Sequence, residues 1–333
     1  MKTVGGLNKI YQTANVGLMT TIVLLMITIS AISPYFMTWY NMEVLSMGFV
    51  QEAIMALGMT VVIISGGIDL SVGSVLVFTA IVVGKLLNAN VSIPAAIAIT
   101  LLVAGSIGFL NALAIIRLRA HPFIVTLGSM TIVRGLAFVF TEGKPVTDFP
   151  EEFSFFGQGY FLYIPFPVFL FILLAILFSF LLRKNRFFHQ IYFIGSNKKS
   201  AHLCGMDVQL CIYVIYILSA LLAGIAGIIT ASQYISANAT FGIDAELRVI
   251  TAVIIGGASL SGGVGSIERT VLGVIFLAVV ANALVQGGVP TYWEKVIYGG
   301  MLICAVLLEK YLYTKSTGIR ETWKDFLLGG SNS

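Results

Sequence analysis

The stretch GGIDLSVG, residues 66–73, interrupts a long apolar run and recurs without a gap as GGASLSGG, residues 256–263. Glycine, serine and aspartate are poor lipid contacts, and broken helices persist at membrane depth only where protein or a water-filled cavity surrounds them. A repeated break of this kind indicates a transport path through the membrane. The alternative is tight packing, because small residues also let helices approach closely.

The two stretches supply the candidate residues for helix breaking and gating. They share glycine, serine and leucine, whereas the carboxylate occurs in the first stretch alone. The candidates are Gly66, Gly67, Asp69, Ser71, Gly73, Gly256, Gly257, Ser261 and Gly263.

The composition is that of an integral membrane protein. Of 333 residues, 58% are hydrophobic and only 10% are charged, with a mean hydropathy of +0.97. A soluble domain carries about 25% charged residues. The longest polar stretches, 141–163 and 183–209, are loop-sized, so we expect no soluble catalytic domain. No basic patch with interleaved aromatic residues indicates nucleic-acid binding.

A membrane-crossing helix needs about 20 apolar residues. The sequence predicts an all-α polytopic membrane protein with about ten transmembrane helices, broken or re-entrant Gly-rich segments and two weakly related halves. The repeat does not decide whether those halves are parallel or inverted. The predicted spans are 16–36, 43–64, 71–88, 94–116, 122–140, 164–182, 210–231, 245–260, 268–286 and 294–312.

The distribution of charge orients these spans. Cytoplasmic segments are enriched in Lys and Arg, and placing both termini inside puts most of the 19 basic residues there. Loop 141–163 is acidic and falls outside. We expect a cytoplasmic N-terminal segment at 1–15, read as part of a signal anchor, a transmembrane domain at 16–312 and a cytoplasmic tail at 313–333.

Several function classes find no support in the sequence. The three histidines and three cysteines show no zinc-site spacing, and no Walker-type GxxxxGK[ST] motif occurs. We therefore expect no catalytic residue, no metal and no cofactor. A membrane-embedded enzyme is disfavoured, and so is a proton-coupled carrier, because no chain of carboxylates is spaced for a proton relay.

Ionisable residues at membrane depth are costly to bury and mark functional positions. Asp69 follows the first break, where it either caps the next helix or serves in gating. Arg134 needs a partner, which we expect to be Asp69 or a carbonyl group at a break. Glu52 likewise must face a partner or water, whereas Glu246 and Arg248 either pair locally or snorkel.

Uncharged polar side chains are frequent in the predicted spans. Together with aromatic residues they suit a neutral polyhydroxylated solute, although interhelical hydrogen bonding is the better explanation for any single one of them. The candidate residues of the translocation path are Asn111, Thr126, Arg134 and Asn282.

The inner loop 183–209 is basic and partly apolar. Gly195 and Gly205 bracket a segment, 196–204, that is long enough for two helical turns. The loop suits docking to a cytoplasmic partner, or equally contact with lipid headgroups.

Several segments together carry a family resemblance. The chain resembles the permease subunits of bacterial ATP-binding-cassette importers for monosaccharides, the ribose-type family that is related to branched-chain amino-acid permeases. The matching segments are GGIDLSVGS at 66–74, HPFIVTLGSMTIVRGLAF at 121–138, IYFIGSNKKSAHLCGMDV at 191–208, AGIAGIITA at 223–231, ELRVITAVIIGGASLSGGVGS at 246–266 and VLGVIF at 271–276.

The resemblance implies an alternating-access permease in the bacterial cytoplasmic membrane. It implies a second permease copy or paralogue with the path along the pair interface, a cytoplasmic ATPase dimer and an extracytoplasmic sugar-binding protein. It also implies that 195–205 forms the coupling segment, with Gly195, Asn197, Ala201 and Gly205 as its candidate residues. A secondary carrier, and the amino-acid branch of the family, for which Arg134 would suit a charged solute, remain the alternatives.

Overall fold

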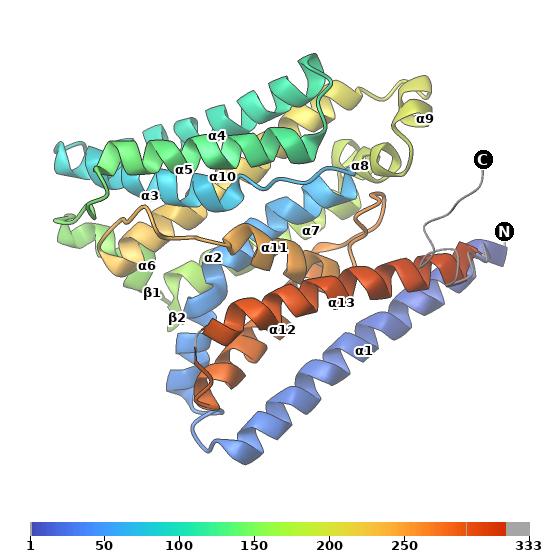
Figure 1. Cartoon of the computed structure of the whole chain (residues 1–333), viewed down its shortest axis with the longest axis horizontal. Coiled ribbons are helices and arrows are strands. Elements are labelled where there is room, and N and C mark those ends of the chain that lie inside the picture. Colours follow the sequence, from blue (N-terminus) through green and yellow to red (C-terminus); the bar gives the residue numbers. More distant parts are fainter. Residues whose placement is uncertain (1, 291, 318–333) are drawn as a thin grey trace.

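The computed structural model describes residues 2–290 and 292–317, with the backbone alone for 2–15 and 311–317. The described chain is a bundle of helices with one small hairpin (Figure 1). The helices are α1 (Lys2–Ile32), α2 (Trp39–Ile64), α3 (Val72–Asn88), α4 (Ile93–Arg117), α5 (Pro122–Thr141), η1 (Glu151–Ser154), α6 (Phe155–Gln158), α7 (Phe166–Lys184), α8 (Arg186–Ser196), α9 (Lys198–Leu203), α10 (Val208–Tyr234), α11 (Ala245–Ile255), α12 (Ile267–Gln286) and α13 (Tyr292–Thr317). The hairpin consists of β1 (Tyr160–Phe161) and β2 (Ile164–Pro165), paired antiparallel.

Each predicted span coincides with a helix, but the helices differ in length. In the described part of the chain, six helices are long and apolar enough to cross a membrane, namely α2, α4, α5, α7, α10 and α12. Helix α11 has 11 residues, about 16 Å at 1.5 Å per residue, which is roughly half of the hydrocarbon thickness. The predicted span 245–260 is therefore a short helix followed by a loop.

Helices α2 and α10 form the centre of the bundle. Helix α10 packs against α2, α3 and α4, and α2 is buried almost without interruption over 50–64. A helix that is apolar on all sides belongs in such a position. The outer helices instead expose large apolar side chains midway along their length, such as Leu102 on α4, Ile132 on α5 and Ile176 on α7, as helices that face lipid do.

The first and last long helices of the described chain lie on the other side of the bundle. Helices α1 and α13 run along one edge, opposite α4 and α5 (Figure 1). Ile29 and Phe36 pack with Val279 of α12 in a small core separate from the main one. The predicted N-terminal segment 1–15 continues into the first span, because α1 begins at Lys2. The predicted tail 313–333 falls, beyond residue 317, outside the described residues.

The predicted outer loop 141–163 is an ordered structure. Val146 pairs with Ala237 in an isolated bridge, and the Ser232 hydroxyl donates to the Phe153 carbonyl at 2.5 Å. These contacts tie the loop to the end of α10.

Candidate functional site

Helices α2 and α11 each end at one of the two glycine-rich stretches, and both end in the same type of turn. Gly66 and Gly67 donate their N–H groups back to the last turn of α2 at 2.9 and 3.0 Å, and Gly257 and Ala258 do so in α11 at 2.7 and 3.1 Å. This is the Schellman arrangement, which needs one residue at positive φ. Gly66 (φ +75°) and Gly257 (φ +86°) supply it. The sequence repeat aligns Gly66 with Gly256, so the two turns have the same geometry but are shifted by one residue relative to the repeat.

The residues after each turn also correspond. The Asp69 carboxylate accepts the Ser71 N–H at 3.0 Å, and the Ser259 hydroxyl oxygen accepts the Ser261 N–H at 3.2 Å. The breaks then differ in length. Ser71 is the N-cap of α3, whereas the second break continues to Ser266, the N-cap of α12.

Asp69 lies at the centre of a closed hydrogen-bond cluster. Its side chain is fully buried, and it accepts the Ser71 hydroxyl at 2.6 Å and the Ser219 hydroxyl of α10 at 2.9 Å. Asn111 of α4 donates to the Ser71 hydroxyl oxygen at 3.0 Å. Buried polar clusters of this kind rigidify a site when every member is paired. Ser219 was missed by the sequence analysis, because nothing distinguishes it within an apolar helix.

A second contact holds the same break. The Ile68 carbonyl oxygen accepts the Tyr216 hydroxyl of α10 at 3.2 Å, and the Thr126 hydroxyl of α5 lies 3.2 Å from it. A Cβ atom on Gly67 would lie 2.7 Å from the Tyr216 hydroxyl. Asn111 and Thr126, both predicted for the path, thus fix the first break to its neighbours in this conformation.

The two breaks meet each other and α8 in one backbone contact, which we call the glycine junction (Ile64, Gly66, Gly195, Gly262 and Gly263). The Gly263 N–H donates to the Ile64 carbonyl at 2.8 Å. A Cβ atom on Gly262 would lie 2.7 Å from the Gly195 carbonyl oxygen and 2.9 Å from the Gly66 Cα, and one on Gly195 would overlap the Ile64 carbonyl. Only glycine permits backbones to approach this closely.

The junction leads directly into the predicted coupling segment. Helix α9 lies within the predicted helical stretch, and the Asn197 side chain caps it by accepting the Ser200 N–H at 3.0 Å. Gly205 ends the segment at φ +79°. Ala201 is buried, whereas Leu203 is 86% exposed. The segment therefore presents an apolar side chain at its tip.

Helices α3 and α11 both begin inside the bundle (Figure 1), and their first turns are in contact. A Cβ atom on Gly73 would lie 2.9 Å from the Gly242 carbonyl oxygen and would overlap the Glu246 carboxylate. Glu246 is buried, and its Oε2 atom has no hydrogen-bond partner among the described residues. Arg134 donates to the carbonyls of Phe241 and Gly242 at 2.6 and 3.1 Å.

These contacts decide the pairing of the predicted membrane-depth charges. Arg134 pairs with carbonyls of the segment that precedes α11, and Asp69 is not its partner. Of the two alternatives for Glu246 and Arg248, local pairing and snorkelling, local pairing is wrong. Arg248 instead forms an ion pair with Glu52 of α2, with 2.5 Å between Nε and Oε1. A sequence has no signal for such a pair, since the partners are 196 residues apart.

Asn282, the remaining residue predicted for the path, lies elsewhere. Its side-chain amide exchanges two hydrogen bonds with Asn41, at 3.0 and 3.2 Å, and its oxygen also accepts Gln286 at 3.2 Å. These bonds tie α12 to the start of α2. The structure does not bring Asn282 together with the other candidates.

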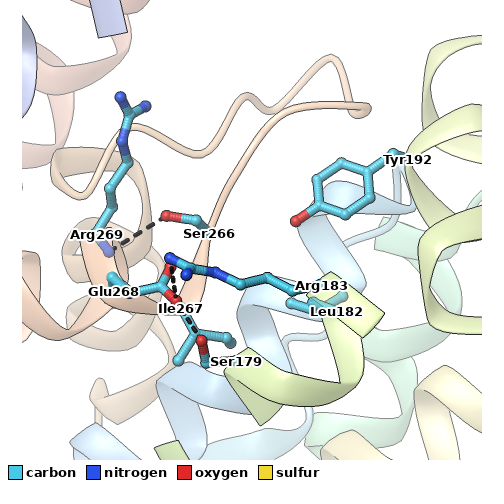
Figure 2. Close-up of a pocket in the computed structure, with 8 residues that line it drawn as sticks. All are labelled: Ser179, Leu182, Arg183, Tyr192, Ser266, Ile267, Glu268 and Arg269. Carbon is cyan, nitrogen blue, oxygen red and sulfur yellow. Dashed lines mark hydrogen bonds and ion pairs between the residues drawn. The ribbon is translucent and has the colours of Figure 1, made fainter. Parts of the chain in front are cut away.

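A pocket of about 180 Å³ lies where α7 and α8 meet the start of α12 (Figure 2). Arg183 reaches across to Glu268 in an ion pair of 2.9 Å, and Ser179 also bonds that carboxylate. Tyr192 donates to the Gly265 carbonyl at 3.0 Å, and burial, followed by the negative charge of Glu268, raises the pKa of its hydroxyl. This exposed ion pair links α7 to α12, and none of the membrane-depth candidates lines the pocket.

Comparison with known proteins places these features in context. The family described as "Branched-chain amino acid transport system / permease component" matches residues 41–306. The ribose import permease protein RbsC of Bacillus subtilis is 37% identical, covering 86% of this chain and 90% of its own length. The L-arabinose ABC transporter permease protein AraH of Azospirillum brasilense is 35% identical, with coverages of 89% and 87%. RbsC of Escherichia coli K12 is 35% identical, with coverages of 86% and 91%. No solved structure matches.

Proposed function

We propose that this chain, which belongs to the family of permease components of branched-chain amino acid transport systems, is the multi-pass permease subunit of an ATP-binding-cassette importer for a monosaccharide. The relatives that match most of its length are named for ribose and L-arabinose. They favour a sugar over an amino acid as solute, and an ATP-driven importer over a secondary carrier. The chain itself is the transport component, and we assign ATP hydrolysis to a partner chain.

The proposal extends to the arrangement in the membrane. We expect a bacterial inner membrane, both termini in the cytoplasm, a transmembrane domain at 16–312 and about ten membrane segments in two weakly related halves. The related geometry of the two breaks supports those halves. A second permease chain completes the path, and an extracytoplasmic sugar-binding protein docks on the outer loops near 141–163, 232–244 and 287–293.

The glycine junction is the observation that carries the proposed coupling. ATP-driven closure of a cytoplasmic ATPase dimer displaces α9 and with it α8. Because Gly195 of α8 touches Ile64 and Gly66 at the first break and Gly262 at the second, a displacement of α8 reaches both breaks at once. Packed backbones transmit such displacements because they cannot compress.

The two breaks respond differently in this mechanism. The Asp69 cluster and the Ile68 carbonyl fix the first break to α4, α5 and α10, so these helices move as one body. The second break is longer, from 256 to 266, and contains three more glycines at positive φ, namely Gly262, Gly263 and Gly265. It is the natural hinge between α11 and α12, and its movement changes which side of the membrane is open.

A reconstitution tests the function. Tagged protein is extracted from its native membrane in mild detergent, its co-purifying chains are identified, and the assembly is placed in liposomes with labelled D-ribose or L-arabinose. We expect an ATPase to co-purify and uptake to require ATP and a binding protein. Uptake by this chain alone, collapsed by a protonophore and indifferent to ATP, would replace the importer by a secondary carrier.

A further inference from the structure

The Glu52–Arg248 ion pair occupies an unusual position in the bundle. Glu52 lies midway along the 26-residue helix α2. Arg248 lies in the first turn of α11, which begins inside the bundle (Figure 1). The pair is therefore at membrane depth, where ionised side chains are costly unless they face water or protein.

The pair is neither fully buried nor placed against lipid. The side chains of Arg248 and Glu52 are 27% and 23% exposed. At a comparable depth, the outward faces of α4, α5 and α7 expose large apolar side chains such as Leu102, Ile132 and Ile176, together with the uncharged side chains of Ser106 and Thr131. A charged pair with a quarter of its surface open does not belong on such a face. The surface that carries it faces an aqueous path or a second protein chain.

The pair also keeps unused hydrogen-bonding capacity. Arg248 uses Nε for Glu52 and Nη1 for the Ile243 carbonyl, at 3.3 Å. Within the described chain, no hydrogen bond engages its Nη2 atom or the Oε2 atom of Glu52. A guanidinium offers five N–H donors in a fixed plane, and a carboxylate offers acceptors alone. Side by side they match the hydroxyl groups of a sugar, which both donate and accept.

We propose that Glu52 and Arg248 line the translocation path and hydrogen-bond the hydroxyl groups of the passing monosaccharide. This inference rests on the proposed importer function and adds a solute-contacting site at membrane depth. The competing role is a structural clamp that holds the short helix α11 against α2. The two roles differ in one respect: a clamp tolerates exchange of the two charges, whereas a solute contact through Arg248 does not.

The first test is a charge exchange in the reconstituted importer, with its ATPase and binding protein, using labelled D-ribose and L-arabinose. Arg248→Ala should reduce uptake about tenfold, since the passing sugar loses its hydrogen bonds to the charged guanidinium. The double variant Glu52→Arg/Arg248→Glu should recover thermal stability but leave uptake reduced. The control is Arg117→Ala, at an exposed arginine in the last turn of α4, which should transport within about twofold of wild type.

The second test reads accessibility directly. Arg248→Cys is made in a chain with Cys204, Cys211 and Cys304 replaced by serine, and is treated with a charged, membrane-impermeant thiol reagent. We expect labelling at residue 248 that D-ribose or L-arabinose slows during turnover. Ile132→Cys, on the lipid-facing side of α5, should stay unlabelled.

The outcomes are distinguishable. Full uptake by Arg248→Ala, recovery of uptake by the charge exchange, or absence of labelling at residue 248 would overturn the site while leaving the importer intact. If the wild-type assembly itself shows no ATP-dependent uptake of any monosaccharide, the proposed function fails first.

Discussion

Asp69 is a buried carboxylate whose hydrogen-bond donors come from the break itself and from α10. Removing it by Asp69→Ala leaves the Ser71 and Ser219 hydroxyls without their acceptor, which costs about 2 kcal/mol of folding free energy. Asp69→Asn keeps the shape and one acceptor oxygen, so it should retain most of the stability. Thermal unfolding in detergent, followed by intrinsic fluorescence, measures both variants.

The control for this prediction is Glu152→Ala, at an exposed carboxylate of η1, which should change stability by no more than about 0.5 kcal/mol. If Asp69→Ala unfolds at the wild-type temperature but loses uptake, Asp69 serves gating, and the prediction that it stabilises the first break is refuted. Equal damage from alanine and asparagine would show that the charge itself is needed.

At the residue scale, the sequence predicts which side chains matter better than it predicts their partners. Asp69 and Arg134 stand out because charges are rare in apolar helices. Their partners, Ser219 and the carbonyls before α11, carry no comparable signal. The sequence places Gly67 at a break because the glycine-rich stretch interrupts an apolar run and recurs. The structure adds a packing reason, since any Cβ atom there meets the Tyr216 hydroxyl.

At the element scale, the glycine junction joins α8 to both breaks, and Gly195→Ala tests it. The added methyl group would overlap the Ile64 carbonyl, so α8 must move away from the end of α2. Overpacking of this kind costs about 1–3 kcal/mol. We expect ATP-driven uptake to fall about tenfold while the ATPase still co-purifies.

Gly128→Ala provides the matched control, because a Cβ placed there meets no atom within 4 Å apart from its chain neighbours and the backbone of its own helix. Alanine is favoured over glycine in a helix interior, so this variant should transport normally. Normal uptake by Gly195→Ala would remove the junction from the coupling mechanism. Loss of ATPase binding in that variant would instead assign Gly195 to docking.

Helix positions were predictable wherever an apolar run had clear ends. The predicted span 94–116 is one residue shorter than α4 at each end, and the predicted span 122–140 is one residue shorter than α5 at its C-terminal end. The prediction for 245–260 was wrong in length, because apolar residues continue through the break to Leu260. Helix α8 was missed because its buried face, Phe188, Ile191 and Ile194, is short and flanked by charges.

At the scale of the whole molecule, the importer requires one end of the bundle to bind an ATPase, and α9 is the candidate. It lies beyond the ends of α4 and α5 (Figure 1), and Leu203, its last residue, is 86% exposed. Composition predicted a membrane protein with a basic inner loop. It could not predict this exposure, which depends on the Asn197 cap and on the burial of Ala201.

Leu203→Asp should therefore weaken ATPase binding without unfolding the chain. Burying a leucine side chain at an interface contributes about 1.5–3 kcal/mol, so its loss weakens binding at least about tenfold. The same substitution at Leu162, which is 75% exposed at the tip of the β1–β2 hairpin, should leave ATPase binding unchanged, because the proposed orientation puts this hairpin on the opposite side of the membrane. Quantitative co-purification of the ATPase compares the two variants, with thermal unfolding as the check on folding. If Leu203→Asp retains the ATPase as fully as Leu162→Asp does, α9 rests on lipid headgroups, and the force that moves Gly195 must enter through another part of the cytoplasmic face.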